Sequence, residues 1–215
     1  QRECPQDSFA LLESRSAIGG TWDLFRYPGI RSDSDMYTFS YGSKPWLAKQ
    51  SLGDGARIRN YITEAAAEAG VDKHIRFQHK VLSASWSSDE ACWTVTALRT
   101  DTDETVCVSC NFLMMCCGYY DYETGYTPDF PGRDSFSGQV IHAQQWPEEL
   151  TYKDKRVIVI GSGATAVTLV PELSKQTRHT VMLQRSPTYI YSQPIEDPWA
   201  VTLRKFLPNS WAFRI

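Results

Sequence analysis

The feature that most constrains the fold of this chain is a fully apolar tetrapeptide followed at once by a glycine-rich turn. Residues 157–160 read Val-Ile-Val-Ile, and the turn after them fits the motif G-x-G-x-x-A. The six residues of this turn are Gly161, Ser162, Gly163, Ala164, Thr165 and Ala166. Beyond it, the pattern predicts a helix over about 164–174 and a strand over 180–184. This order predicts a βαβ unit with parallel strands.

Each small residue of the turn has a physical role in binding a dinucleotide. Gly161 permits the tight turn, Gly163 lets the backbone approach a pyrophosphate, and Ala166 lets the helix pack closely on the strand. A diphosphate there accepts hydrogen bonds from free N–H groups at the helix N-terminus, where the helix dipole favours anions. The turn therefore predicts a dinucleotide site, and a purely structural glycine turn is the alternative.

The end of the second strand indicates which dinucleotide binds. NAD sites place an Asp or Glu about 20 residues after the turn, where it accepts from the ribose 2′-hydroxyl. Here the strand ends in Gln184, Arg185 and Ser186, without a carboxylate. Because a guanidinium pairs with phosphate oxygens in a bidentate manner, Arg185 and Ser186 favour the 2′-phosphate of NADP(H). Alternatively, Arg185 is a solvated charge at a strand end.

The rest of the chain predicts a mixed α/β fold with a boundary near residue 150. Glu13 ends a short apolar run in the manner of a ribose-binding carboxylate, but its spacing alone leaves that role open. We expect an ordered loop with one helical turn over 14–35 and a helix over 56–69 that Gly70 caps. Strands are expected at 75–77, 81–86, 93–99, 105–110 and, as a buried apolar run, 112–117; residues 118–155 read as a connecting loop.

Composition and cysteine spacing exclude several classes of protein. With 22 Lys and Arg against 25 Asp and Glu, the net charge of −3 leaves no basic surplus for nucleic acid. No apolar run approaches the roughly 18–20 residues of a membrane span. We expect no metal site, since Cys107 and Cys110 form a lone C-x-x-C on opposite faces of a strand. The six cysteines, at positions 4, 92, 107, 110, 116 and 117, are expected to be buried small hydrophobes of a reduced cytoplasmic protein.

Three segments resemble fingerprints of class B flavin monooxygenases of the Baeyer–Villiger type. Residues 136–147 fit F-x-G-x-x-x-H-x-x-x-W-P through Phe136, Gly138, His142, Trp146 and Pro147. Residues 19–33 fit G-G-x-W-x-x-x-x-Y-P-G-x-x-x-D, and residues 117–128 resemble the link between the two nucleotide-binding domains of that family. The resemblance runs from Phe9 to Ile215.

The resemblance implies an α/β flavoprotein with two dinucleotide-binding domains, a Rossmann-like FAD domain and a Rossmann-like NADPH domain inserted into it. We expect the FAD-binding domain over 1–150, with a linker over 118–150, and the first part of the NADPH-binding domain over 151–215. Both domains would be incomplete here. Both ends look cut, so we expect the chain to be a segment of a longer protein that is inactive alone.

The implied reaction is an oxygen transfer that uses FAD and NADPH. In this family, NADPH reduces FAD and the reduced flavin takes up O₂ as a C4a-peroxide. One oxygen atom then enters a ketone or is added to the sulfur or nitrogen of a small organic substrate, such as a sulfide or thioamide. Another NADPH:flavin oxidoreductase and a non-catalytic nucleotide-binding remnant remain alternatives. Substrate identity, oligomeric state and membrane association stay open.

The resemblance also implies residue roles. Glu13 would hold the FAD ribose, the Val81 backbone would meet the adenine, and Asp33 would stand beside the flavin and position a catalytic arginine expected beyond residue 215. His142 and Trp146 would couple domain motion. The other implied cofactor residues are Gly20, Thr21 and Trp22 in the flavin loop, with Arg31 and Ser32 where the nicotinamide approaches.

Overall fold

The computed structural model describes residues 5–208 and 211, and the chain divides into two compact units. The first unit comprises Gln1–Gly20 and Arg59–Tyr120, and the second comprises Thr21–Ile58 and Asp121–Ile215. Each unit therefore contains two stretches that are far apart in the sequence.

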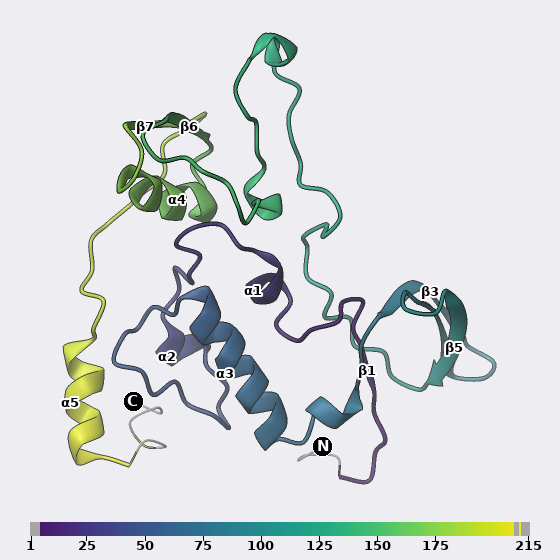
Figure 1. Cartoon of the computed structure of the whole chain (residues 1–215). Helices are drawn as coiled ribbons and strands as arrows, with labels where there is room; N and C mark the ends of the chain where they lie inside the picture. The colour runs from purple at the N-terminus through teal and green to yellow at the C-terminus, as the bar shows by residue number, and fades with distance from the viewer. Residues whose placement is uncertain (1–4, 209–210, 212–215) are drawn as a thin grey trace. The chain divides into compact units, whose positions relative to one another are not determined.

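The first unit contains two small sheets. β1 (Leu11–Leu12) pairs in parallel with β2 (Ile75–Arg76), which follows α3 (Gly55–Glu68) and the short 3-10 helix η1 (Asp72–His74). The Ala-rich helix α3 ends before Gly70, whose φ of +68° is one that glycine adopts without a Cβ penalty. β3 (His79–Ser87), β4 (Cys92–Arg99) and β5 (Glu104–Cys110) form an antiparallel sheet in that order (Figure 1).

The second unit contains the predicted βαβ element. β6 (Arg156–Ile160) and β7 (His179–Leu183) are parallel, and α4 (Ala164–Ser174) joins them and packs on both (Figure 1). The predicted helix over 164–174 is confirmed. The first strand begins one residue earlier than predicted, and the second, predicted over 180–184, is shifted by one residue at both ends. The helix could be predicted from the spacing of its apolar residues, because α4 buries Ala166, Leu169 and Leu173 on one face.

The core of the second unit joins the segment after α1 (Thr21–Leu24) to α4. Phe25, Tyr27, Leu169 and Leu173 form one buried cluster, all less than 9% exposed. Other residues pack around this cluster, namely Leu24, Ile30, Ala143, Trp146, Tyr152, Val157 and Val159. The burial of these side chains is the main favourable term that holds the 21–30 segment on the βαβ element.

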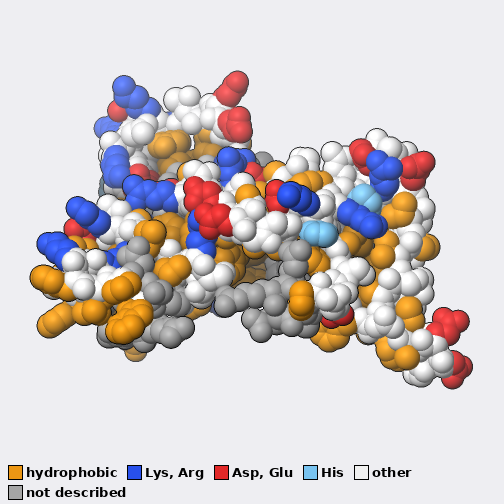
Figure 2. All heavy atoms as spheres, turned by 90° about the horizontal axis from the view of Figure 1, so that it is seen from below, with side chains coloured by type: hydrophobic (Ala, Val, Ile, Leu, Met, Phe, Trp, Pro, Cys, Tyr) orange, Lys and Arg blue, Asp and Glu red, His pale blue; other side chains and the backbone are white. Residues whose placement is uncertain are grey.

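The remaining helices of the second unit are short. They are α2 (Met36–Phe39), the 3-10 helices η2 (Arg133–Ser135) and η3 (Ala143–Gln145), and α5 (Pro198–Phe206). α5 begins where the Asp197 carboxylate accepts hydrogen bonds from the N–H groups of Trp199 and Ala200. Apolar side chains lie at the surface over α5 (Figure 2), including Trp199 and Phe206. Within the part of the chain that the structure describes, no helix has the length and apolar character to cross a membrane.

Two predictions from the sequence are wrong. Residues 112–117 form no strand, and Phe112, Met114 and Met115 are each more than 70% exposed. An apolar run shows that a segment favours burial, but a strand also needs a hydrogen-bonded neighbour, and none of the described strands pairs with it. The cysteines are not buried either: positions 107, 116 and 117 are exposed, and 92 and 110 are half-buried, while Cys4 lies outside the described residues.

Truncation of the buried α4 face is expected to destabilise the second unit. Leu173 is 2% exposed, so Leu173→Ala should lower the free energy of unfolding by about 2–5 kcal/mol. Leu47, which is 59% exposed, gives the matched control, and Leu47→Ala should change it by less than about 0.5 kcal/mol. Urea unfolding measures both values, and equal losses for the two variants would contradict the assigned core.

Candidate dinucleotide site

The glycine-rich turn connects the carboxyl ends of both parallel strands. The Gly161 N–H donates to the Leu183 carbonyl oxygen at 2.9 Å, and the Gly161 φ of +142° is one that favours glycine. A Cβ added to Gly161 would lie 3.7 Å from the Ala166 Cβ, which is ordinary contact. The turn therefore depends on the backbone freedom of Gly161 and not on a lack of room for a Cβ.

Open space lies in front of the first turn of α4. Gly163 is the N-cap residue in an extended conformation, and a Cβ added to it would meet no heavy atom of the described chain within 4 Å. Helical bonding begins with the Val167 N–H, which donates to the Gly163 carbonyl oxygen at 3.0 Å. The preceding N–H groups, those of Ala164–Ala166 in the first turn, therefore have no carbonyl of their own helix to bind. This arrangement suits an anion.

Residues beyond β7 lie at the same edge of the sheet. The register pairs Ile160 with Leu183, so Arg185 and Ser186, both exposed, follow β7 where Gly161 follows β6. The Thr188 hydroxyl donates to the Ser162 carbonyl oxygen at 2.7 Å and holds this segment beside the turn. Thr188 was not predicted as a site residue, because a lone threonine in an irregular segment fits no sequence pattern.

The fingerprint segment over residues 25–30, which follows the predicted flavin-loop residues Gly20, Thr21 and Trp22, packs directly on α4. Gly29 has a φ of +77°, and a Cβ added to it would overlap the Glu172 Cγ and lie 3.2 Å from the Thr168 Cγ2. Glycine at this position therefore permits both the backbone conformation and the close approach. Thr21 and half-buried Trp22 lie in α1 just before this segment, and the Thr21 carbonyl accepts from the Phe25 N–H.

Tyr27 connects this segment to the glycine-rich motif. Its side chain is 7% exposed and belongs to the buried cluster with Leu169 and Leu173 of α4. Burial raises the pKa of Tyr27 above its ordinary value. The fingerprint residue Tyr27 thus packs on the helix that follows the glycine-rich turn.

Arg31, Ser32 and Asp33 lie on the stretch that follows the Tyr27–Gly29 turn. Arg31 Nε and Asp33 Oδ1 are 3.4 Å apart, and both side chains are about 40% exposed. The backbone is fixed just before the pair and between its two residues, since the Gly55 N–H donates to the Ile30 carbonyl and the Ser32 N–H donates to the Gly53 carbonyl. An exposed ion pair of this kind contributes little stability, so the backbone bonds set its position.

The linker fingerprint has a packing explanation in this structure. The His142 ring fills the space beside Gly125, and the Phe136 ring fills the space beside Gly138. His142 also caps η3, since its Nδ1 accepts from the Gln144 N–H at 3.3 Å. Trp146, at the margin of the buried cluster, meets Tyr152 edge to face, with 6.0 Å between ring centroids. Pro147 follows Trp146 and accepts from the Leu150 N–H.

In the first unit, Glu13 is joined to the start of β3. The Glu13 carbonyl accepts from the His79 N–H at 2.9 Å, and its carboxylate Oε1 accepts from the Arg15 N–H at 2.9 Å. Val81 follows two residues later on β3, at a register shift where it pairs with Ala97. Glu13 and the Val81 strand are thus brought together by backbone bonds.

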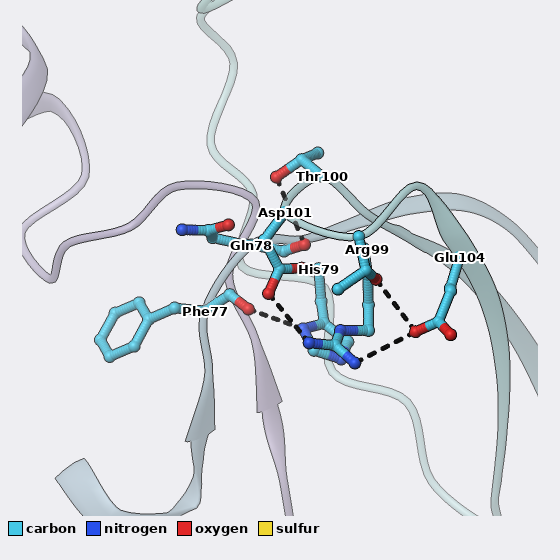
Figure 3. Close-up of polar contacts among 8 residues, drawn as sticks. Phe77, Gln78, His79, Arg99, Thr100, Asp101 and Glu104 are labelled. Atoms are coloured by element: carbon cyan, nitrogen blue, oxygen red, sulfur yellow. Dashed lines mark hydrogen bonds and ion pairs between the residues drawn. The ribbon is translucent and has the colours of Figure 1, made fainter.

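Polar contacts hold this corner of the first unit (Figure 3). Arg99 binds Asp101 at 2.9 Å and Glu104 at 3.2 Å, and His79 Nδ1 lies 2.6 Å from the Phe77 carbonyl oxygen. The hydrogen bond from Arg99 lowers the pKa of Asp101. Of the predicted FAD residues, Glu13, Gly20 and Val81 belong to this unit, whereas Thr21, Trp22 and Asp33 belong to the second.

Acidic and sulfur ligands do not gather into a metal centre in the described part of the chain, where no group of three or more His, Cys, Asp and Glu residues has the geometry to hold an ion.

Two tyrosines with raised pKa values, buried Tyr27 and half-buried Tyr37, predict a loss of stability at alkaline pH. Burial raises the pKa of Tyr27 and Tyr37 above 10.0, so the folded state keeps phenol protons that the unfolded state releases. The contribution of the two protonated phenols to the free energy of unfolding is complete below pH 10. It is lost as the pH rises through their folded-state pKa values.

Urea unfolding between about pH 8 and pH 11 measures this loss. Tyr27→Phe should show a shallower decline above about pH 10 than the parent chain, and Tyr189→Phe, at a fully exposed side chain, should follow the parent. The interpretation fails if all three proteins lose stability with the same slope.

Comparison with known proteins identifies the family. The model of the flavin-binding monooxygenase-like family matches residues 51–208. The FAD-containing monooxygenase EthA of Mycolicibacterium smegmatis is 54% identical over 213 residues, which is 99% of this chain and 43% of EthA. The chain thus spans less than half the length of this curated relative.

Two solved structures share the fold. The OTEMO complex with FAD and NADP matches with a TM-score of 0.70 and 29% sequence identity. The match covers 86% of this chain and 36% of the OTEMO chain. The oxidized steroid monooxygenase bound to NADP matches with a TM-score of 0.69 and 30% sequence identity. The match covers 84% of this chain and 34% of the monooxygenase chain. The predicted resemblance and the predicted α/β class of a flavoprotein with two dinucleotide-binding domains are confirmed. The chain belongs to the flavin-binding monooxygenase-like family.

Proposed function

We propose that this chain supplies the NADPH-binding turn and part of the FAD site of an FAD- and NADPH-dependent monooxygenase. The observation that carries the proposal is the open space at Gly163, in front of N–H groups that have no helical partner. A dinucleotide diphosphate fits this space and these donors, since it brings acceptor oxygens and negative charge. Arg185 and Ser186, at the same sheet edge, would hold the 2′-phosphate.

For FAD, the donor set on the first unit fits an adenosine. The Glu13 carboxylate accepts one N–H through Oε1 and has further lone pairs, so it can also accept a ribose hydroxyl. The exposed β3 strand at Val81 would offer backbone atoms to the adenine. Gly20, Thr21 and Trp22 would line the flavin, and Asp33 would lie beside it and orient an arginine from another part of the full protein.

Bound FAD would supply the oxygen-activating chemistry once NADPH has reduced it. The residues of this chain would bind and orient the two cofactors, with Arg31 and Ser32 beside the nicotinamide. Oxygen from O₂ would go to a small organic substrate, either into a ketone in the Baeyer–Villiger sense or onto sulfur or nitrogen. The likeness to the OTEMO complex and to the steroid monooxygenase supports this reaction class.

We further propose that residues 1–150 belong to the FAD-binding domain, with the linker over 118–150, and residues 151–215 to the NADPH-binding domain. Phe136, Gly138, His142, Trp146 and Pro147 would transmit domain motion, since His142 and Trp146 contact their neighbours through packed rings. The described cysteines are free thiols, which suits work in the reducing cytoplasm.

The reaction class is tested on the protein produced at the full length of its gene. Oxygen uptake with NADPH should rise when a cyclic ketone or an aryl sulfide is added, and the product should carry one ¹⁸O atom when ¹⁸O₂ is supplied. Flavin reduction without any oxygenated product would favour the other NADPH:flavin oxidoreductases. NADP⁺ binding without flavin binding would favour a non-catalytic nucleotide-binding protein.

A side chain at position 163 is expected to block the diphosphate and leave the fold intact. Gly163→Val should weaken NADP⁺ binding by at least about tenfold, because its side chain would occupy the open space. Gly42 also has open space around it, so Gly42→Val is the matched control and should bind normally. Isothermal titration calorimetry gives both affinities, and unchanged binding in Gly163→Val would place the diphosphate elsewhere.

Removal of the Arg185 charge is expected to act on NADP⁺ and not on NAD⁺. Arg185→Gln should lower NADP⁺ affinity by about tenfold or more, the size of one charge-assisted hydrogen bond, with little change for NAD⁺. Arg178 is exposed at the opposite end of β7, and Arg178→Gln is the control for charge loss. A parallel loss for both dinucleotides would mean that Arg185 does not read the 2′-phosphate.

A further inference from the structure

We propose that Thr188 is a positioning residue that sets the preference of the site for NADP(H) over NAD(H), because it holds the loop that carries Arg185 and Ser186 against the glycine-rich turn. This inference rests on the proposed function, which assigns the 2′-phosphate to Arg185 and Ser186. It deepens that function by naming a residue that would act through Arg185 without contacting the dinucleotide itself.

The loop after β7 is tied to the glycine-rich turn at both of its ends. At its start, the Gly161 N–H donates to the Leu183 carbonyl oxygen at 2.9 Å. At its end, the Thr188 hydroxyl donates to the Ser162 carbonyl oxygen at 2.7 Å. Residues 184–187 therefore form a short loop that these two bonds close against the start of the turn.

The two bonds differ in the groups that form them. The bond between Gly161 and Leu183 joins two backbone groups and continues the pairing of β6 with β7, so it does not depend on a side chain. The bond at Thr188 depends on one hydroxyl in an exposed segment. Loss of that hydroxyl would therefore release the far end of the loop while the turn keeps its link to the sheet.

Pro187 makes the loop stiff next to the Thr188 bond. A proline ring fixes its own φ, and it also disfavours the helical conformation for the residue before it, which here is Ser186. Thr188 follows directly. A bond at Thr188 is thus transmitted to Ser186 through a dipeptide with few backbone conformations.

A loop held in this way favours the 2′-phosphate, because less of the chain has to be ordered when the phosphate binds. An arginine loses conformational freedom when it pairs with a phosphate, and a preformed loop reduces the backbone part of that cost. NAD(H) carries a hydroxyl in place of the 2′-phosphate and would form no such charge pair with Arg185. The Thr188 bond should therefore strengthen NADP⁺ binding and leave NAD⁺ binding unchanged.

The test is the affinity of the full-length protein for NADP⁺ and for NAD⁺, measured by isothermal titration calorimetry. Thr188→Val keeps the β-branched shape and removes the hydroxyl. It should weaken NADP⁺ binding by about three- to tenfold, the range of one hydrogen bond, and change NAD⁺ binding by less than about twofold. Thr188→Ser keeps the hydroxyl and should bind NADP⁺ as the parent does.

Thr202→Val is the matched control. The hydroxyl of exposed Thr202 also donates to a carbonyl oxygen at 2.7 Å, that of Pro198 in α5, so the same substitution removes an equivalent bond outside the loop. This variant should keep the affinity of the parent for both dinucleotides. When Arg185→Gln is already present, Thr188→Val should cause a smaller loss of NADP⁺ affinity than it causes alone, because the bond would act through Arg185.

The outcomes separate this inference from the proposed function. Unchanged NADP⁺ affinity in Thr188→Val would overturn the positioning role while the dinucleotide site stands. Equal losses for NADP⁺ and NAD⁺ would also overturn it, since the bond would then support the turn as a whole. Fully additive losses in the variant that combines Thr188→Val with Arg185→Gln would show that Thr188 does not act through Arg185. Failure of the parent protein to bind NADP⁺ would overturn the proposed function and this inference together.

Discussion

The packing of the 25–30 segment on α4 is the interaction on which the second unit depends. Phe25 and Tyr27 fill the apolar face that Leu169 and Leu173 present, and this burial fixes where Gly29 meets the helix. The stretch with Arg31 and Asp33 follows from it, because the chain leaves Gly29 toward backbone partners at residues 53 and 55. One apolar contact therefore sets the position of a fingerprint that the sequence resemblance assigns to the flavin.

Small residues around α4 have three different structural roles. Gly29 leaves room for Glu172 and Thr168, Gly161 adopts a positive φ beside Ala166, and Gly163 leaves room that no described atom fills. The roles of Gly29 and Gly161 are explained by packing and backbone conformation within the chain. Gly163 has no such partner within the described chain, and it stands at the N-terminus of α4, whose dipole attracts anions. This contrast supports the proposal that the dinucleotide diphosphate lies against Gly163.

Much of the fold could be predicted from the sequence, and the exceptions have physical causes. The βαβ element followed from local patterns, because a fully apolar strand, a glycine turn and an amphipathic helix each depend on neighbouring residues. The 112–117 run was misassigned because apolar character does not identify the neighbour that covers it. The packing of Phe25 and Tyr27 on α4 was not predicted, since it joins segments far apart in the sequence and such a contact has no periodic signal.

We propose that the glycine-rich turn and the segment over residues 25–32 form one packed body that a dinucleotide stabilises. Hydrogen–deuterium exchange with and without NADP⁺ tests it most directly. Protection of amides in residues 161–167 together with those in residues 25–32 is the predicted result, because α4 connects the two. Protection confined to residues 161–167, with the 25–32 amides exchanging as in the free protein, would contradict the account.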